Sequence, residues 1–297
     1  MVELNPTVLV SIDGSYLIYY SLFGAVNKWK DASSLNAELL ENVDQENLLK
    51  LTTRKDFTDL FEEQLIKRFE TIYWILNTRI FKDIKFTEDP KIFLCLDSPL
   101  KDNWRMQLYP EYKQQRKIAP QKFNVRDTFA YGMDVLLNKI DINKYFGIKI
   151  VKIHAAEGDD IIATINTKLS ATYKFIIASD RDFLQLPDNV RQFNLEGKEV
   201  KPEEHKDTIP TGKQYLLAKI LTGDTSDNIP QVFPRCGYAT AMKLVKQPEV
   251  LKEKLKNDPA ALEQFRLNKK LIDFSHIPES LIESIMQELG ANNLEVI

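Results

Sequence analysis

Short apolar runs along the chain alternate with longer stretches in which apolar residues recur every three or four positions. The short runs are too brief for helices, and their β-branched and aromatic residues are typical of buried strands. They lie at residues 7–14, 91–97, 148–153 and 174–179. Residues 57–80 and 161–169 have the apolar spacing of amphipathic helices. Strands that alternate with helices predict an α/β fold with a mostly parallel central sheet flanked by helices.

The pattern changes after Asn194. Residues 195–213 are polar and predict a hairpin and a linker, whereas helical spacing continues from there to the end of the chain. We therefore expect two domains. An α/β domain would cover residues 1–203, and a helical subdomain would cover residues 204–297.

Acidic residues lie at the ends of the predicted strands and at the start of the helix after the third strand. They are Asp13, Asp97, Glu157, Asp159, Asp160, Asp180 and Asp182. Because the carboxyl ends of parallel strands meet at one edge of a sheet, these carboxylates are expected to converge. Carboxylates within ~4–6 Å of one another cannot all stay ionised unless a cation neutralises them. Mg²⁺ and Mn²⁺ prefer oxygen ligands, so the pattern predicts a divalent-metal site.

Each half of this pattern also has an ordinary structural explanation. Acids in the first turn of a helix complement its dipole and cap free N–H groups, and an Asp after a strand is a common turn residue. For residues 157–160 or residues 180–182 alone, we favour that explanation. The metal site is favoured because both halves occur within a single helix–strand–turn stretch and further acids follow the other strands.

Composition limits the kind of protein. Of 297 residues, 43% are apolar and 28% are charged, as in soluble globular proteins. No apolar run approaches the ~20 residues of a membrane span, and no basic segment precedes an apolar one at the N-terminus. Cys95 and Cys236 lie far apart and form neither a disulfide framework nor a zinc pattern. A reducing, cytoplasmic setting is expected.

The formal net charge of −3 argues against a generally basic surface, but the bases are locally concentrated. Between Lys101 and Arg126 there are seven Lys or Arg residues and only two acids. The aromatics among them, Trp104, Tyr109, Tyr112 and Phe123, are candidates for stacking on unpaired bases. A solvated helix face would explain "YKQQRK" in isolation. Its position after Asp97 favours a phosphate-binding surface beside the metal site.

Six segments resemble the structure-specific 5′ nucleases, the family of flap endonucleases, polymerase I 5′-nuclease domains and phage ribonuclease H enzymes. The segments are "VSIDGSYLIYYSLF", "FLCLD", "YPEYKQQRK", "AAEGDDIIA", "ASDRDFLQL" and "LTGDTSDNIPQV", and they occur in the family's order. A later segment, "NKKLIDFSHIPESLIESIM", is most similar to phage ribonuclease H of the T-even type. The resemblance implies a PIN-like 5′-nuclease core and a C-terminal helix-turn-helix-like motif that binds duplex.

The resemblance also implies a metal site. Its acids would be Asp13, Asp97, Glu157, Asp159, Asp180, Asp182 and Asp227, with Asp160 and Asp224 as outer members. One ion would face Asp13, Asp97 and Asp159. The other would face Asp180, Asp182 and Asp227.

The resemblance further implies contacts with the substrate. Lys113 and Arg116 match a basic pair at the scissile phosphate, which places both among the catalytic residues. Arg105 lies in a basic arch over about residues 99–130, with Lys117 beside the pair. Tyr19 matches an aromatic residue that contacts a 5′-side base. The nucleic-acid-binding residues would thus be Arg105, Lys113, Arg116, Lys117, Tyr19 and Arg235.

The chain departs from the family in two places. The family's helix–two-turn–helix segment usually reads like "SDNIPGVPGIGPKTA", whereas here "SDNIPQVFPRCGYATA" is one residue longer and keeps only Gly237 of its later glycines. Arg235 is expected to replace electrostatically the close backbone contact with phosphate that those glycines allow. The stretch 27–89 is longer than in close relatives, and the sequence assigns it no role.

The expected function is a Mg²⁺-dependent 5′→3′ exonuclease and flap endonuclease with ribonuclease H activity, which removes RNA primers in phage DNA replication. Two Mg²⁺ ions, with Mn²⁺ as a substitute, would activate water and stabilise the leaving oxygen. We expect a monomer in the host cytoplasm that binds 5′ flaps or ends, RNA–DNA hybrids, and single-stranded-DNA-binding and replication proteins, but no membrane. Two alternatives stay open: a non-cleaving DNA-junction-binding protein and a PIN-like ribonuclease.

Overall fold

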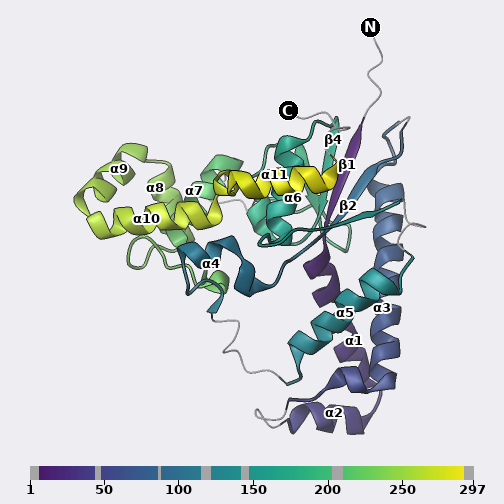
Figure 1. Cartoon of the computed structure of the whole chain (residues 1–297). Helices are drawn as coiled ribbons and strands as arrows, with labels where there is room; N and C mark the ends of the chain where they lie inside the picture. Colours follow the sequence, from purple (N-terminus) through teal and green to yellow (C-terminus); the bar gives the residue numbers. More distant parts are fainter. Residues whose placement is uncertain are drawn as a thin grey trace.

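A parallel five-stranded sheet lies at the centre of the protein (Figure 1). In this computed structural model the strand order is β3-β2-β1-β4-β5, and each neighbouring pair is parallel. The strands are β1 (Val8–Asp13), β2 (Lys91–Leu96), β3 (Lys149–Lys152), β4 (Tyr173–Ile177) and β5 (Val190–Phe193). The structure describes residues 7–43, 48–85, 88–114, 122–141, 147–202 and 210–290.

The predicted α/β fold with a parallel sheet is confirmed, and each of the four apolar runs forms a strand. Strand β5 was not predicted, because its four residues include the polar Arg191 and Gln192 and it lies at the edge of the sheet. The hairpin predicted after Asn194 begins with an antiparallel bridge between Phe193 and Glu199.

Side chains alternate along each strand and build a hydrophobic layer on each face of the sheet. Val8, Val10 and Ile12 of β1 pack with helices α1, α3 and α5, whereas Leu9 packs with α6 and α11. These helices are α1 (Gly14–Asp31), α3 (Lys55–Ile75), α5 (Val125–Asn138), α6 (Gly158–Lys168) and α11 (Glu279–Leu289). Because both faces are covered, the central strands β1 and β2 are mostly apolar rather than alternating.

The predicted helix over residues 57–80 is confirmed as α3 followed by a π-helical turn, η2 (Leu76–Ile80). The buried face of α3 includes Phe57, Phe61 and Leu65, which belong to the same core as the buried face of α1. Helix α2 (Ser34–Glu41) adds Leu40 to that core. The described part of the stretch 27–89 therefore covers one face of the sheet.

The helices after the sheet form a lobe to one side, at the left of Figure 1. They are α7 (Gly212–Thr222), α8 (Tyr238–Val245), α9 (Pro248–Asn257) and α10 (Pro259–Ile272), and Leu221, Met242 and Leu251 belong to their shared core. The chain then returns, and Leu281 and Ile285 of α11 pack against the α6 side of the sheet. The predicted domain boundary at 203/204 falls outside the described residues and stays a prediction.

Shorter helices connect these elements. They are α4 (Trp104–Leu108), η1 (Leu51–Thr53), η3 (Leu100–Asp102), η6 (Arg181–Gln185), η7 (Thr225–Asp227) and η8 (Phe274–His276). None of the helices in the described ranges is both long enough and apolar enough to cross a membrane.

The start of α1 leaves no room for a side chain. A Cβ atom on Gly14 would overlap Leu96 Cδ2 and lie 2.9 Å from the carbonyl oxygen of Cys95 in β2. We expect Gly14→Ala to lower the free energy of unfolding by about 1–3 kcal/mol, because α1 or β2 must shift. Denaturant unfolding followed by circular dichroism measures this change.

Gly24→Ala in the same helix is the matched control. A Cβ atom there would have Gln64 Oε1, at 4.0 Å, as its only neighbour within that distance, so we expect no loss of stability. Equal stability of the Gly14→Ala protein and the wild type would contradict the close packing between α1 and β2.

Candidate active site

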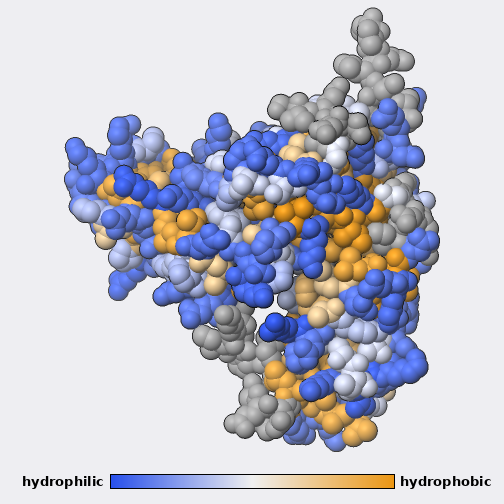
Figure 2. All heavy atoms as spheres, viewed as in Figure 1, coloured by the Kyte–Doolittle hydropathy of each residue, from blue (hydrophilic) through white to orange (hydrophobic). Residues whose placement is uncertain are grey.

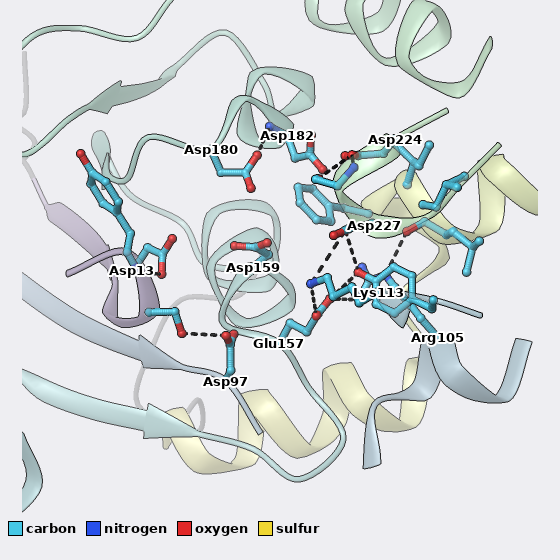
Figure 3. Close-up of a pocket in the computed structure, with 18 of the residues that line it drawn as sticks. Asp13, Asp97, Arg105, Lys113, Glu157, Asp159, Asp180, Asp182, Asp224 and Asp227 are labelled. Atoms are coloured by element: carbon cyan, nitrogen blue, oxygen red, sulfur yellow. Dashed lines mark hydrogen bonds and ion pairs between the residues drawn. The ribbon is translucent and has the colours of Figure 1, made fainter. Parts of the chain in front are cut away.

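An acidic cavity of about 290 Å³ lies at the carboxyl edge of the sheet. Of the predicted acids, all but Asp160 line it: Asp13, Asp97, Glu157, Asp159, Asp180, Asp182, Asp224 and Asp227. Figure 3 shows Asp13, Asp159 and Asp180 pointing toward one another from β1, the start of α6 and the segment after β4. The structure thus brings together acids that are far apart in the chain. Their roles as metal ligands stay a prediction.

Backbone and hydroxyl groups hold two of these carboxylates in place. Asp13 ends β1 and caps α1, because its Oδ1 accepts a hydrogen bond from the Tyr16 amide at 2.9 Å. Asp97 follows β2 and accepts from the Ser15 hydroxyl and the Gly158 amide, each at 2.6 Å. Asp97 therefore ties the start of α1 to the start of α6.

Asp13, Asp97, Asp159 and Asp180 repel one another. Burial, and then the charges of Asp97 and Asp180, raise the pKa of Asp13 to about 7. Burial, and then the charge of Asp180, raise the pKa of Asp159 well above its usual range. Among the described residues, no Lys or Arg forms an ion pair with Asp13, Asp97 or Asp159. A cation between these oxygens would relieve the repulsion.

The side chains do not yet have the arrangement of a metal site. Within the described ranges, no group of three or more acidic, His or Cys side chains is placed so that it could hold an ion. The donor set still fits a hard cation, because every acid that lines the cavity offers oxygen only.

On the opposite side of the cavity, acids are paired with Lys113. Its ammonium contacts Glu157 and lies 3.8 Å from Asp227 Oδ2 (Figure 3). Its backbone has a φ of 56°, and its amide donates to the Asp227 carbonyl at 2.9 Å. Burial alone would raise the pKa of Glu157, but Lys113 and Arg105 outweigh it and lower that pKa to about 2. Glu157 is therefore ionised and neutralised by the protein itself.

Lys219 pairs in the same way with two further acids, a role that sequence analysis missed. Its ammonium contacts Asp182 and lies 3.0 Å from Asp224 Oδ2. Burial would raise the pKa of Asp224, but Lys219 reverses the effect and lowers it. The available signal was the position of Lys219 in the last turn of α7, which ends at Thr222, two residues before Asp224.

Arg105 and Asp160 form a buried ion pair. Only 4% of Arg105 is exposed, and its guanidinium donates to both Asp160 oxygens, to Glu157 and to the Leu271 carbonyl. Asp160 also accepts from Trp104 Nε1 and from the Glu157 amide. In this structure Arg105 lines the cavity and supports Glu157. The contact of Arg105 with nucleic acid and the role of Asp160 as an outer member of the metal site stay predictions.

Most aromatics of the basic segment are also turned inward. Trp104, Tyr112 and Phe123 are buried, and the Tyr112 hydroxyl lies 2.9 Å from Glu157 Oε2 and 3.0 Å from Asp227 Oδ2. The expectation that these three rings stack on bases is therefore wrong. Tyr109 is partly buried, and its hydroxyl donates to the Asn228 carbonyl at 3.1 Å.

Of the other predicted contacts, Tyr19 lines the cavity and is partly exposed. Arg235 is exposed in the connection between α7 and α8, outside the cavity, with a φ of 58° that favours glycine. Arg235 thus adopts the left-handed conformation although it is not a glycine. Arg116 and Lys117 lie outside the described residues.

Comparison with known proteins identifies the family of the chain that forms this cavity. The family model described as "5'-3' exonuclease, N-terminal resolvase-like domain" matches residues 8–210, most of the chain. The chain belongs to the 5′-3′ exonuclease family.

Individual relatives align with this chain over different lengths. The 5′-3′ exonuclease of Aquifex aeolicus is 30% identical over 234 residues, 76% of each chain. The ribonuclease H of Enterobacteria phage T4 is 28% identical over 238 residues, 73% of this chain and 74% of that one. The 5′-3′ exonuclease of Buchnera aphidicola (Schizaphis graminum) is 32% identical over 185 residues, which span only 58% of its length.

Solved structures of the bacteriophage T5 enzyme share the fold of this family member. T5 5′-exonuclease with bound zinc aligns with a TM-score of 0.58 and 16% identity over 95% of this chain and 98% of that one. The T5 flap endonuclease in a pseudo-enzyme–product complex with DNA and metal ions aligns with a TM-score of 0.57 and 13% identity over the same shares of both chains. The α/β core and the C-terminal helical lobe therefore belong to one shared architecture.

Asp13→Asn should change the pH dependence of stability in EDTA. Because the pKa of Asp13 is raised from 3.8 to about 7, the folded protein holds this proton more tightly than the unfolded chain. The contribution of Asp13 to the free energy of unfolding should therefore fall as the pH rises from 3.8 to about 7, and this contribution should be absent from the variant. Asn still caps α1. Denaturant unfolding across this pH range tests the prediction, and identical pH profiles for the two proteins would contradict it.

Proposed function

We propose that this protein is a Mg²⁺-dependent 5′ nuclease that hydrolyses phosphodiesters near the 5′ ends of DNA and of RNA–DNA duplexes, as a 5′→3′ exonuclease and flap endonuclease with ribonuclease H activity. One observation carries the proposal: the partly buried Asp13, Asp97 and Asp159, which form no ion pair among the described residues, crowd the carboxyl edge of the sheet in a member of the 5′-3′ exonuclease family. The phage T4 relative is named ribonuclease H, and the T5 relative has been crystallised with DNA and metal ions.

The ligand roles that we propose are those that the family resemblance implies. Asp13, Asp97 and Asp159 would face one Mg²⁺ ion, and Asp180, Asp182 and Asp227 a second, with Glu157 and Asp224 nearby. Mn²⁺ would substitute, because it accepts the same oxygen ligands. A pair of such ions lowers the pKa of an attacking water and stabilises the leaving oxygen.

The protein's own cations act on the phosphate. Lys113 lies between Glu157 and Asp227, so a phosphate that enters the cavity would compete with these acids for its ammonium. Lys113 would then stabilise the charge that develops on the phosphate. The phosphate would compete in the same way with Asp182 and Asp224 for the ammonium of Lys219. Arg116 and Lys117 are proposed to add to this charge.

The helical lobe is proposed to hold the duplex. Exposed Arg235 and the backbone around Gly237 would contact phosphates, which makes the affinity salt-dependent and insensitive to sequence. In this division, residues 1–203 supply most of the metal site, whereas residues 204–297 bind the duplex and also contribute Asp224 and Asp227 to the cavity. We further propose that the protein works as a monomer, together with single-stranded-DNA-binding and replication proteins, in primer removal during phage replication in the host cytoplasm.

A cleavage assay with labelled substrates tests the function. The substrates are a 5′-flap duplex, an RNA–DNA hybrid and single-stranded RNA, each with Mg²⁺ or with EDTA. We expect cleavage of the first two with Mg²⁺ and none with EDTA. Cleavage of single-stranded RNA alone would favour a PIN-like ribonuclease, and binding without cleavage would favour a junction-binding protein.

Asp180→Asn should abolish cleavage and leave duplex binding within about threefold of wild type, because it removes a metal ligand but no phosphate contact. Single-turnover cleavage and fluorescence anisotropy measure the two effects. Asp188→Asn, an exposed acid beyond the site, is the control and should behave as wild type. Normal turnover in Asp180→Asn would remove Asp180 from the active site.

Lys113→Ala should lower the rate of the chemical step about 10²–10³-fold and change KM little, because the lost charge acts on the transition state. Exposed Lys101 in the same basic segment gives the control variant Lys101→Ala. A higher KM with an unchanged kcat would instead assign Lys113 to substrate binding.

A further inference from the structure

A buried glutamine is hydrogen-bonded to the segment that carries Asp180 and Asp182. Gln192 of the edge strand β5 is only 4% exposed, and its backbone pairs with Ile176 of β4. Its side chain extends past the end of β4, where Nε2 donates to the carbonyl oxygens of Ala178, at 3.0 Å, and of Asp180, at 2.7 Å. Gln192 is thus bonded to the backbone of a predicted metal ligand.

Apolar packing ends where β4 ends. Ile177 and Ala178 are buried, whereas Ser179, Asp180 and Arg181 are exposed. Figure 2 shows a similar contrast on this face of the molecule, with apolar side chains gathered in the part that holds the sheet and hydrophilic ones over most of the helical lobe. The segment after β4 therefore depends on hydrogen bonds rather than on packing to keep its carboxylates in place.

Asp180 is fixed through both its side chain and its backbone. Its carboxylate accepts a hydrogen bond from the Asp182 amide at 2.8 Å, and its carbonyl accepts the one from Gln192. The carboxylate points toward Asp13 and Asp159 (Figure 3). A shift of the backbone at Asp180 would therefore change the distances among the oxygens that are proposed to bind metal.

The needs of the strand alone do not account for Gln192. Asp180 is exposed, so water can satisfy its carbonyl without any side chain. The Oε1 atom of Gln192 is buried and has no hydrogen-bond partner within the described ranges. An apolar side chain of the same length would avoid that unpaired oxygen, which is unfavourable. The two hydrogen bonds that Nε2 donates are what distinguishes a glutamine at this position.

We propose that Gln192 is a positioning residue for the metal site, whose two hydrogen bonds fix the backbone at Asp180 and thereby set the affinity for a divalent cation. The inference rests on the proposed function and adds to it a residue outside the acidic cavity. Loss of a group that orients a metal ligand typically costs about 10–100-fold in metal affinity.

Mn²⁺ binding without nucleic acid tests this role, measured by electron paramagnetic resonance of the free ion. Gln192→Met keeps the length of the side chain but removes both donated hydrogen bonds. We expect it to weaken Mn²⁺ binding about tenfold. The Mg²⁺ concentration for half-maximal cleavage should rise by a similar factor, whereas the KM for the flap duplex should not change.

A double-mutant cycle separates positioning from general destabilisation. Because Gln192 is proposed to act through Asp180, Gln192→Met should weaken Mn²⁺ binding no further in the Asp180→Asn protein. Gln192→Leu, which also lacks the donors, is a second variant and should give the same result. Denaturant unfolding verifies that each protein is folded.

Gln64→Met is the matched control. Gln64 is also a glutamine with 4% exposure, but it lies on α3 and does not line the acidic cavity. Its replacement should leave Mn²⁺ binding and the Mg²⁺ dependence of cleavage unchanged.

Three outcomes would overturn the inference. They are unchanged Mn²⁺ binding in the folded Gln192→Met or Gln192→Leu protein, an equal loss in Gln64→Met, and a full further loss in the Asp180→Asn background. In each of these cases the wild type still binds Mn²⁺ and cleaves the flap duplex, so the proposed function stands. A wild type that neither binds Mn²⁺ nor cleaves would overturn the proposed function together with the role of Gln192.

Discussion

Repulsion between partly buried carboxylates is the constraint on which this structure depends. Asp13, Asp97 and Asp159 would move apart if they were free to do so, yet strand ends and hydrogen bonds hold them at one edge of the sheet. Strands β1 and β2 are held in place, because hydrophobic layers cover both of their faces. The packing of a large apolar core thus sustains a concentration of charge that is unfavourable until a cation binds.

The cavity divides into an unneutralised half and a neutralised half. Lys113, Lys219 and Arg105 balance the acids on one side, whereas no ion pair reaches Asp13, Asp97 or Asp159 among the described residues. A cation is therefore attracted most strongly to the unneutralised half. The lysines of the other half are the groups that an anionic phosphate would recruit, and each phosphate contact would release a carboxylate.

Sequence periodicity predicted the buried strands and the acids at their ends, because both depend on residues that are close in the chain. It could not predict the roles of Arg105, Asp160 or Lys219, which depend on distant contacts. The Arg105 side chain bonds to the carbonyl of Leu271, 166 residues away, and only that packing decides that it points inward. Strand β5 was missed for a related reason, since its polar residues form a strand only through pairing with β4.

The aromatics show why residue type alone does not identify a stacking surface. Trp104 and Tyr112 carry polar atoms that find partners when buried, in Asp160 for one and in Glu157 and Asp227 for the other. The hydrogen bonds of the two buried rings hold these acids in position. The acids therefore account for the burial of Trp104 and Tyr112. Phe23 has no polar atom and would gain most from burial, yet it remains half exposed beside Tyr19.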